Sequence, residues 1–212
     1  RWKYEVYAND QAIHDPNDLF SMSSKDLQAV RFIPQLIDAN VASLKIEGRM
    51  KSAYYIATVV HAYRMLIDEY MEKHALSEER IAFYEEEIAK AENRPTGPGF
   101  YLGMPKAHDQ LYGVNGAGVT QEYIADVLAY DAHTQIATLQ VRNHFYPHME
   151  AEVFGPHTAS TRFRIEEVYD LEDTALDVLN QPMQIVKIKS ALPLEPQAMI
   201  RKVYDRTQRN VY

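Results

Sequence analysis

The sequence predicts a fold in two parts, an α/β segment followed by an all-β domain. The first part is indicated by residues 41–47, a short apolar segment that ends at Gly48 and runs directly into a long helical pattern. The second part is indicated by a hydrophobic period of two beyond about residue 99, as in half-buried strands. Residues 93–99, rich in Pro and Gly, break every regular pattern between the two parts. We expect the last portion of a β/α (TIM-like) barrel over residues 1–73, a helical linker over residues 74–98 and a small β-barrel over residues 99–212.

The first fifty residues are typical of the end of a larger α/β domain. Strands are expected at residues 3–7 and 19–22, and Ser24 can cap a helix that follows them. Pro34 is expected to limit or bend this helix, because proline lacks the N–H that a helix interior needs. Since so short a segment cannot close a β/α barrel, the other strands are expected upstream of this chain or in a partner.

Residues 41–47 are expected to form a strand with one apolar and one charged face. The apolar face consists of Val41, Leu44 and Ile46, and the other face consists of Ser43, Lys45 and Glu47. Side chains two residues apart lie roughly 6.6 Å apart on one side of a strand, so Lys45 and Glu47 can reach one another. Burying two unlike charges costs several kcal/mol before their attraction offsets it. The pair is therefore either an internal ion pair or part of a catalytic or ligand site.

Two cations, Arg49 and Lys51, follow that segment and precede a long helix that Ser52 can cap. Helix N-termini attract anions through their unpaired N–H groups and the helix macrodipole. The two cations either contact an anionic ligand or lie solvated on a turn, and the anionic ligand is the sharper hypothesis.

Two helices are expected after this turn. From residue 53 to about residue 73 the apolar side chains recur at helical spacing, which predicts a helix roughly 30 Å long. Ser77 opens a second helix, in which Ile81, Tyr84 and Ile88 recur at the same spacing. Much of the acidic excess of the chain lies on this second helix, where it is typical of a solvated face.

The all-β domain is indicated by six short apolar segments that alternate with turns, a pattern typical of a small barrel or sandwich. The expected strands are residues 123–128, 136–141, 151–153, 162–168, 183–188 and 199–204. Residues 113–118 resemble a phosphate-binding glycine loop, but they run into an extended segment, so a hairpin turn at Asn115 and Gly116 is favoured.

The composition excludes several classes of protein. The chain has 212 residues, of which 46% are hydrophobic, and it has no run of about eighteen apolar residues that would span a membrane. It has no Cys, which excludes disulfides, thiol catalysis and cysteine-ligated metal within it and fits a cytoplasmic protein. The formal net charge of −8 argues against a generally polyanion-binding surface.

Residues 1–6 have neither an initiating Met nor the apolar core of a signal peptide, so we expect the chain to be cut from a longer protein.

Metal and hydrolase motifs are weak. His144 and His148 are four residues apart, but Pro147 between them spoils a helical metal-binding face, so no metal site is expected. The chain has neither a Gly-x-Ser-x-Gly elbow nor a His-Glu-x-x-His zinc helix. The sequence therefore offers no nucleophile for a self-contained hydrolase.

Three segments of the first part resemble the collagenase-like U32 peptidase family in order and spacing. These are Ser24-Lys25-Asp26-Leu27, Ile33-Pro34-Gln35-Leu36-Ile37-Asp38 and Ser43-Leu44-Lys45-Ile46-Glu47-Gly48-Arg49-Met50-Lys51-Ser52. In the β-domain, residues 143–145, 150–156, 181–183 and 199–202 resemble the C-terminal region of that family. His148-Met149 stands where the family tends to have a Gly-Asp turn, so the geometry of that loop is expected to differ.

The resemblance implies a β/α-barrel-like catalytic domain, present as its last portion, and a translation-factor-like β-barrel. It also implies competing activities. Some members are described as collagen-degrading proteases. Others take part in hydroxylation, either of the wobble uridine of tRNA, with prephenate, or of ribosomal RNA or a quinone precursor. The hydroxylating members resemble iron–sulfur proteins with a cysteine cluster, and residues 1–4 look like the sequence just after the last of those cysteines. We therefore expect an iron–sulfur cluster upstream, no cofactor within this chain and no activity of this fragment alone.

On this resemblance we expect a role in prephenate-dependent tRNA wobble-uridine 5-hydroxylation. The alternatives are a collagenase-like protease that hydrolyses peptides and a non-catalytic RNA- or protein-binding module. The expected partners are tRNA or a protein substrate such as collagen, together with a paired family member, and no membrane. The candidate catalytic residues are Glu47, as orienting carboxylate or proton acceptor, and Lys45; the candidate substrate contacts are Arg49, Lys51 and Ser43.

Overall fold

In the computed structural model the chain forms two compact units, Arg1–Thr120 and Gln121–Tyr212, and each has its own hydrophobic core. The structure describes residues 5, 7–12, 20–91, 94–105, 110–112 and 122–203. The glycine loop at residues 113–118 and the segment 1–4 lie outside the described residues. None of the described helices is long and apolar enough to cross a membrane.

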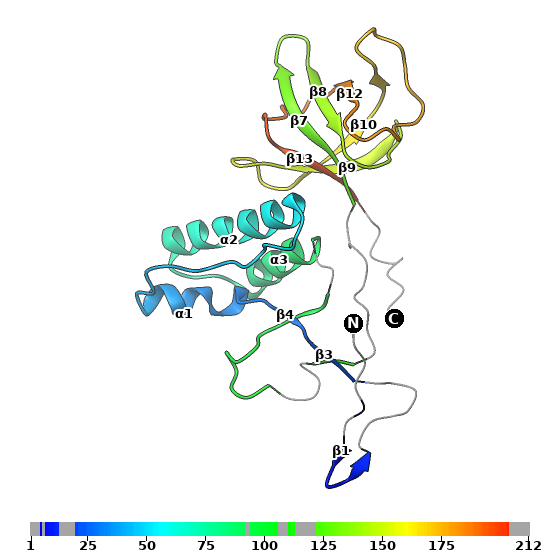
Figure 1. Ribbon diagram of the computed structural model, residues 1–212. Helices are drawn as coiled ribbons and strands as arrows, with labels where there is room; N and C mark the ends of the chain where they lie inside the picture. The colour runs from blue at the N-terminus through cyan, green and yellow to red at the C-terminus, as the bar shows by residue number, and fades with distance from the viewer. Residues whose placement is uncertain are drawn as a thin grey trace. The chain divides into compact units, whose positions relative to one another are not determined.

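The first unit combines helices with short paired strands (Figure 1). The 3-10 helix η1 (Val30–Phe32) leads into α1 (Ile33–Asp38), which is followed by α2 (Ala53–Lys73) and α3 (Glu78–Ala89). The strand pairs are β1 (Tyr7–Ala8) with β2 (Gln11–Ala12), β3 (Phe20–Ser24) with β6 (Gln110–Tyr112), and β4 (Asp26–Leu27) in parallel with β5 (Thr96–Gly97). Figure 1 shows the three α-helices packed beside one another.

The long helix α2 confirms the helix expected from residue 53 to about residue 73. Ser52 is its N-cap, and the Ser52 hydroxyl accepts a hydrogen bond from the Tyr55 N–H at 3.1 Å. The helix ends at His74, which adopts a left-handed conformation with φ 54°, a common way to end a helix. The helix α3 confirms the helix expected to open at Ser77, and the structure adds that Ser77 caps it by accepting from the Arg80 N–H at 3.3 Å.

The core of the first unit lies where η1 and α1 meet α2 and α3. Its buried members are Val30, Ile33, Val59, Ala62, Leu66, Tyr84 and Ile88. Leu66 of α2 is fully buried, which fits the apolar stripe that faces the core.

The strand expected at residues 41–47 is wrong, because residues 41–48 have no regular secondary structure. The apolar side chains of that segment are partly exposed, at 44% for Val41, 40% for Leu44 and 39% for Ile46. A strand is stabilised only when a neighbouring strand completes its hydrogen bonds, and none of the described strands pairs with this segment. The hydrophobic period of residues 41–47 is that of a strand, but the described residues contain no strand that pairs with this segment.

The helix expected after Ser24 is wrong in its start. Ser24 belongs to β3, and the chain becomes helical only at Val30–Phe32. Pro34 lies in the first turn of α1, where the N–H that proline lacks would have no helical partner. Pro34 therefore begins this helix instead of bending it.

The second unit is a seven-stranded antiparallel sheet that curls into a half-barrel (Figure 1), which confirms the all-β prediction. Its spatial order is β10-β9-β13-β7-β8-β12-β11, so β10 and β11 are the edges. The strands are β7 (Tyr123–Asp131), β8 (Ile136–Val141), β9 (Met149–Phe154), β10 (Thr161–Ile165), β11 (Val168–Tyr169), β12 (Ile185–Lys189) and β13 (Met199–Lys202). The single strand expected at residues 162–168 is wrong: β10 pairs with β9 and β11 with β12, so the chain changes its partner strand in between.

Alternation of buried and exposed residues builds the core of this sheet. In β8 the side chains of Ala137, Leu139 and Val141 are fully buried, as the period of two predicts. One ion pair is also buried: Arg201 of β13 lies opposite Glu152 of β9, with Nη2 and Oε2 2.6 Å apart. The Arg201 guanidinium lies 4.4 Å from the centroid of the Phe154 ring. This ion pair joins β9 to β13 inside the sheet.

The chain divides between Thr120 and Gln121, further along than residue 99, where the β-domain was expected to begin. The parallel pairing of β5 with β4 holds Thr96–Gly97 in the first unit. The helix α3 packs on α2, so the segment expected to be a linker is part of the helical core.

Candidate functional site

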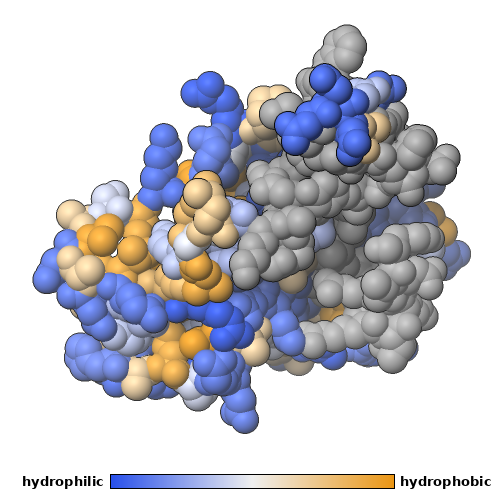
Figure 2. Space-filling view, turned by 90° about the horizontal axis from the view of Figure 1, so that it is seen from below, coloured by the Kyte–Doolittle hydropathy of each residue, from blue (hydrophilic) through white to orange (hydrophobic). Residues whose placement is uncertain are grey.

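Most of the predicted site residues line a groove of about 730 Å³ in the first unit. We call it the 41–47 groove, because the segment 41–47 lines it together with parts of β4, α1 and α2 and with Tyr101. Much of its lining is apolar, including Val41, Leu44 and Ile46. Figure 2 shows hydrophobic patches exposed among hydrophilic residues on the described surface.

The segment 41–47 is anchored at both ends although it is not a strand. At its start the Val41 N–H donates to the Leu36 carbonyl at 3.0 Å. At its end the Lys51 N–H donates to the Gly48 carbonyl at 2.9 Å and closes a turn. Gly48 packs so tightly that a Cβ there would lie 1.9 Å from Cδ1 of Ile56. A side chain at this position would have to displace the end of the Ile56 side chain of α2.

Glu47 and Lys45 lie on the same segment but differ in their contacts within the protein. The Glu47 Oε1 atom accepts a hydrogen bond from the Arg49 N–H at 2.9 Å, which fixes the carboxylate over the turn. Lys45 is exposed, and no carboxylate among the described residues lies within ion-pair distance of its ammonium group. The charge of Lys45 is therefore available to a ligand of the groove.

Lys51 is held by its surroundings. Its Nζ atom lies 2.7 Å from Oδ2 of Asp26 and 4.5 Å from the centroid of the Tyr55 ring. The third cation that lines the groove, Arg64, donates to Asp68 of the same helix at 2.9 Å. Lys45 is thus the cation of this lining that the described carboxylates leave without an ion pair.

Tyrosine hydroxyls supply most of the remaining polar groups. The Tyr63 oxygen accepts a hydrogen bond from the Ala29 N–H at 2.9 Å. Burial raises the pKa of Tyr63, so its hydroxyl stays protonated and able to donate. Tyr55 and Tyr101 also line the groove. The lining therefore combines apolar walls, hydrogen-bond donors and two ammonium groups, of which that of Lys51 is paired with Asp26.

Four of the five predicted site residues line the groove: Ser43, Lys45, Glu47 and Lys51. Arg49 is exposed and is not part of the lining. The sequence reasoning missed Asp26, although it stands in the Ser24-Lys25-Asp26-Leu27 motif that carried the resemblance. It also missed Tyr55 and Tyr63, whose eight-residue spacing places them on one face of α2 but is equally typical of packing.

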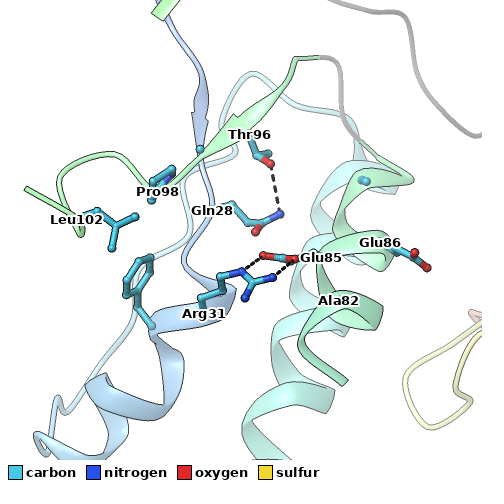
Figure 3. Close-up of a pocket in the computed structure, with 11 residues that line it drawn as sticks. Gln28, Arg31, Ala82, Glu85, Glu86, Thr96, Pro98 and Leu102 are labelled. Atoms are coloured by element: carbon cyan, nitrogen blue, oxygen red, sulfur yellow. Dashed lines mark hydrogen bonds and ion pairs between the residues drawn. The ribbon is translucent and has the colours of Figure 1, made fainter. Parts of the chain in front are cut away.

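A second hollow of about 600 Å³ lies in the same unit and is lined by residues of β5, η1 and α3 (Figure 3). Figure 3 shows the Arg31 side chain directed at Glu85 and the Glu86 side chain directed away from it. The Arg31 Nε atom lies 2.8 Å from Oε1 of Glu85, and Nη2 lies 3.0 Å from Oε2. Phe32 lines this hollow, and its ring stacks on Tyr101 of the groove at 4.6 Å between centroids. The charges of Arg31 and Glu85 neutralise one another here, which makes this hollow a weaker candidate for an anion than the groove.

Comparison with known proteins identifies the family. Residues 1–111 match the model of peptidase family U32, and residues 119–201 match that of the peptidase family U32 C-terminal domain. The chain is 40% identical over 210 residues to tRNA hydroxylation protein P1 of Bacillus subtilis, covering 95% of this chain and 49% of that protein. It is 30% identical over 173 residues to a collagenase of Porphyromonas gingivalis, covering 80% of this chain and 41% of that protein.

A solved structure is also similar. It is the C-terminal domain of a Geobacillus thermoleovorans protein assigned to the U32 peptidases, 44% identical, with a TM-score of 0.38 and coverage of 39% of this chain and 93% of that chain. The chain spans about half the length of the curated relatives it matches. The two family models together account for nearly all of the sequence, and the chain belongs to peptidase family U32.

Proposed function

We propose that the chain is part of an enzyme that hydroxylates the wobble uridine of tRNA at position 5, with prephenate as co-substrate. The observation that carries this proposal is the 40% identity to tRNA hydroxylation protein P1 of Bacillus subtilis, which extends over 95% of this chain. The chain spans 49% of that protein, so the activity is proposed for the longer protein and not for this segment alone.

The 41–47 groove supports a small anionic ligand with an apolar body. Apolar side chains can cover a hydrocarbon ring, and the exposed ammonium group of Lys45 can pair with a carboxylate. We assign to Glu47 the orientation of the substrate or the acceptance of a proton, and to Ser43 a hydrogen bond to the ligand. Arg49, which lies outside the lining, is assigned to a phosphate of the RNA.

An iron–sulfur cluster does not fit the residues of this chain. Such clusters are held by cysteine thiolates, and the chain contains no Cys. The part of the chain that the structure describes also holds no group of three His, Cys, Asp or Glu residues that could bind a metal. We propose that the ligands of a cluster lie in the rest of the longer protein, and no step of the chemistry is assigned to it here.

We further propose that the first unit is the last portion of a β/α barrel, because it is too short to close such a barrel alone and the chain spans only 49% of its Bacillus subtilis relative. The protein is proposed to act in the cytoplasm, where it would meet tRNA.

Deletion of the gene tests the proposed reaction. Mass spectrometry of tRNA nucleosides from the deletion strain is expected to show loss of 5-hydroxylated wobble uridine, and a plasmid copy of the gene should restore it. Unchanged hydroxylation in the deletion strain would remove the basis of the proposal.

Peptide hydrolysis is the second candidate function, favoured by the 30% identity to a collagenase of Porphyromonas gingivalis. In this case Glu47 would act as general base, with a nucleophile from elsewhere in the longer protein. Cleavage of gelatin by the purified full-length protein, lost in Glu47→Ala without loss of folding, would favour this function over hydroxylation.

The second unit is proposed to dock tRNA or a protein partner. Titration of residues 121–212 with tRNA at several salt concentrations checks this role, because contacts to phosphates make affinity fall steeply with salt. The third possibility, a binding module without catalysis, requires this binding to persist while both activities are absent.

A further inference from the structure

Lys51 is enclosed in a way that differs from the other cations near the groove. Its side chain is 23% exposed and that of Asp26 is 22% exposed, so water and ligands have limited access to the pair. The ammonium group has a carboxylate at 2.7 Å and the face of an aromatic ring at 4.5 Å. A ligand anion would have to displace Asp26 to reach it.

Asp26 is itself fixed by the backbone around it. It lies in β4, and its N–H donates to the Pro95 carbonyl at 3.1 Å. Two residues further along the same pair of strands, β4 and β5, the Gln28 N–H donates to the Gly97 carbonyl at 2.9 Å. Asp26 therefore presents its carboxylate from a strand that two ladder hydrogen bonds hold in place.

On the other side, Lys51 is connected to the segment 41–47. The hydrogen bond from the Lys51 N–H to the Gly48 carbonyl closes the turn at residues 48–51. Gly48 lies close to the Ile56 side chain, and the Glu47 carboxylate accepts a hydrogen bond from the Arg49 N–H in the same turn. Because the segment has no strand ladder, this turn is what fixes its end in the described part of the molecule.

We propose that Asp26 and Lys51 are a positioning pair that fixes the turn 48–51 and thereby places Glu47 and Lys45 in the groove. Lys51 acts through Asp26 and does not contact the substrate. The link to catalysis rests on the proposed function of the groove, whereas the mechanical part can be measured without any activity.

The mechanical test is limited proteolysis of the full-length protein with trypsin under native conditions. Local opening exposes the bonds after Lys45 and Arg49, and cleavage reports the population of the open form. In Lys51→Met we expect cleavage there to be about tenfold faster, as the loss of one charge-assisted contact predicts. The control, Lys73→Met, removes an ion pair with Glu69 at the other end of α2 and should leave these bonds as resistant as before.

An exchange of the two charges separates positioning from direct contact. The double variant Asp26→Lys with Lys51→Asp keeps an ion pair of the same combined length, so it should recover resistance to trypsin relative to Lys51→Met. Unchanged cleavage in Lys51→Met, or no recovery in the exchanged variant, would overturn the positioning role.

Hydroxylation of tRNA in a complemented deletion strain gives the second readout. A positioning pair predicts that Asp26→Asn and Lys51→Met both lower the hydroxylated fraction and that the exchanged variant raises it again. If Lys51 contacts the substrate, Asp26→Asn keeps the activity and the exchanged variant does not recover it, which contradicts the inference. If the deletion strain keeps its hydroxylated uridine, the proposed function fails while the proteolysis result still decides the mechanical role.

Discussion

Glu69 of α2 is surrounded by hydrogen-bond donors. Arg80 donates to both of its carboxylate oxygens, at 3.1 and 2.9 Å, and the Tyr84 hydroxyl donates at 2.6 Å. Lys73 adds a contact at 3.0 Å. The hydrogen bonds from Arg80 lower the pKa of Glu69 to about 2, against the opposing effect of burial. The carboxylate thus ties α2 to the start of α3.

This lowered pKa predicts a pH-dependent stability. Because the folded pKa lies below the ordinary value of 4.5, the contribution of Glu69 is full above pH 4.5 and disappears as the pH falls towards 2. In urea unfolding experiments, wild type should be more stable than Glu69→Gln at pH 6, and the difference should shrink steadily between pH 4.5 and 3. A stability difference for Glu69→Gln that stays constant over this pH range would contradict the assigned pKa.

In the second unit, the carboxylate of Glu195 lies so close to Gly155 that it leaves little room for a side chain there. A Cβ at this position would lie 2.2 Å from Oε1 of Glu195 and 3.0 Å from Cβ of Ala198. The Glu195 oxygen cannot move away freely, because it accepts from the His157 and Thr158 N–H groups at 2.9 and 3.0 Å.

Gly155→Ala is therefore expected to destabilise the second unit by about 1–3 kcal/mol, the usual cost of an overpacked site. Thermal or urea unfolding of the purified variant measures this loss. Gly97→Ala is the matched control, because its nearest neighbour is the flexible Lys25 side chain at 3.2 Å, and it should cost far less. Equal stability of the two variants would show that the loop of Gly155 adapts.

At the residue scale the sequence predicted local contacts better than distant ones. The sequence predicts Ser52 as a cap and Ser77 as the start of a helix, because a helix start and its helix are adjacent in the chain. The partner of Lys51 could not be recognised, because Asp26 is brought to it only by the packing of β4 near the start of α2. For this reason Lys51 was interpreted as a ligand contact, although the structure gives it a neighbour within the protein.

At the scale of elements, the N-terminus of α2 offers a direct test of the cap. Ser52→Ala removes the acceptor for the Tyr55 N–H and should lower the free energy of unfolding by about 1 kcal/mol. Ser52→Asp keeps an acceptor at the same position and should retain most of the stability. Circular dichroism during urea unfolding provides the measurement, and an unaffected Ser52→Ala variant would mean that packing alone fixes the start of α2.

The elements that depend on their own sequence were predictable, whereas those that depend on a neighbour were not. The helix α2 and the strand β8 have the bounds that their hydrophobic periods predicted. The segment 41–47 has the composition of a strand but no partner among the described strands. Residues 162–168 read as one strand by period, yet the sheet divides them between two edges.

At the scale of the whole molecule, the two units have separate cores. Leu66 belongs to the core of the first unit and Leu139 to that of the second, and both are fully buried. Truncation of a buried leucine to alanine typically costs about 2–5 kcal/mol. We therefore expect calorimetry to resolve two transitions, with Leu66→Ala lowering one and Leu139→Ala lowering the other. A single transition that both variants shift equally would show that the units unfold together.

The central claim is that the 41–47 groove is the ligand site of a tRNA-hydroxylating protein and that Lys45 holds its anionic ligand. The most direct test is the hydroxylated fraction of wobble uridine, measured by mass spectrometry in a deletion strain that carries Lys45→Met on a plasmid. We expect less than about a tenth of the wild-type fraction, because the variant removes the charge that pairs with the ligand. Lys73→Met, a lysine of α2 outside the groove, should restore the full wild-type fraction. Full hydroxylation with Lys45→Met would contradict the claim.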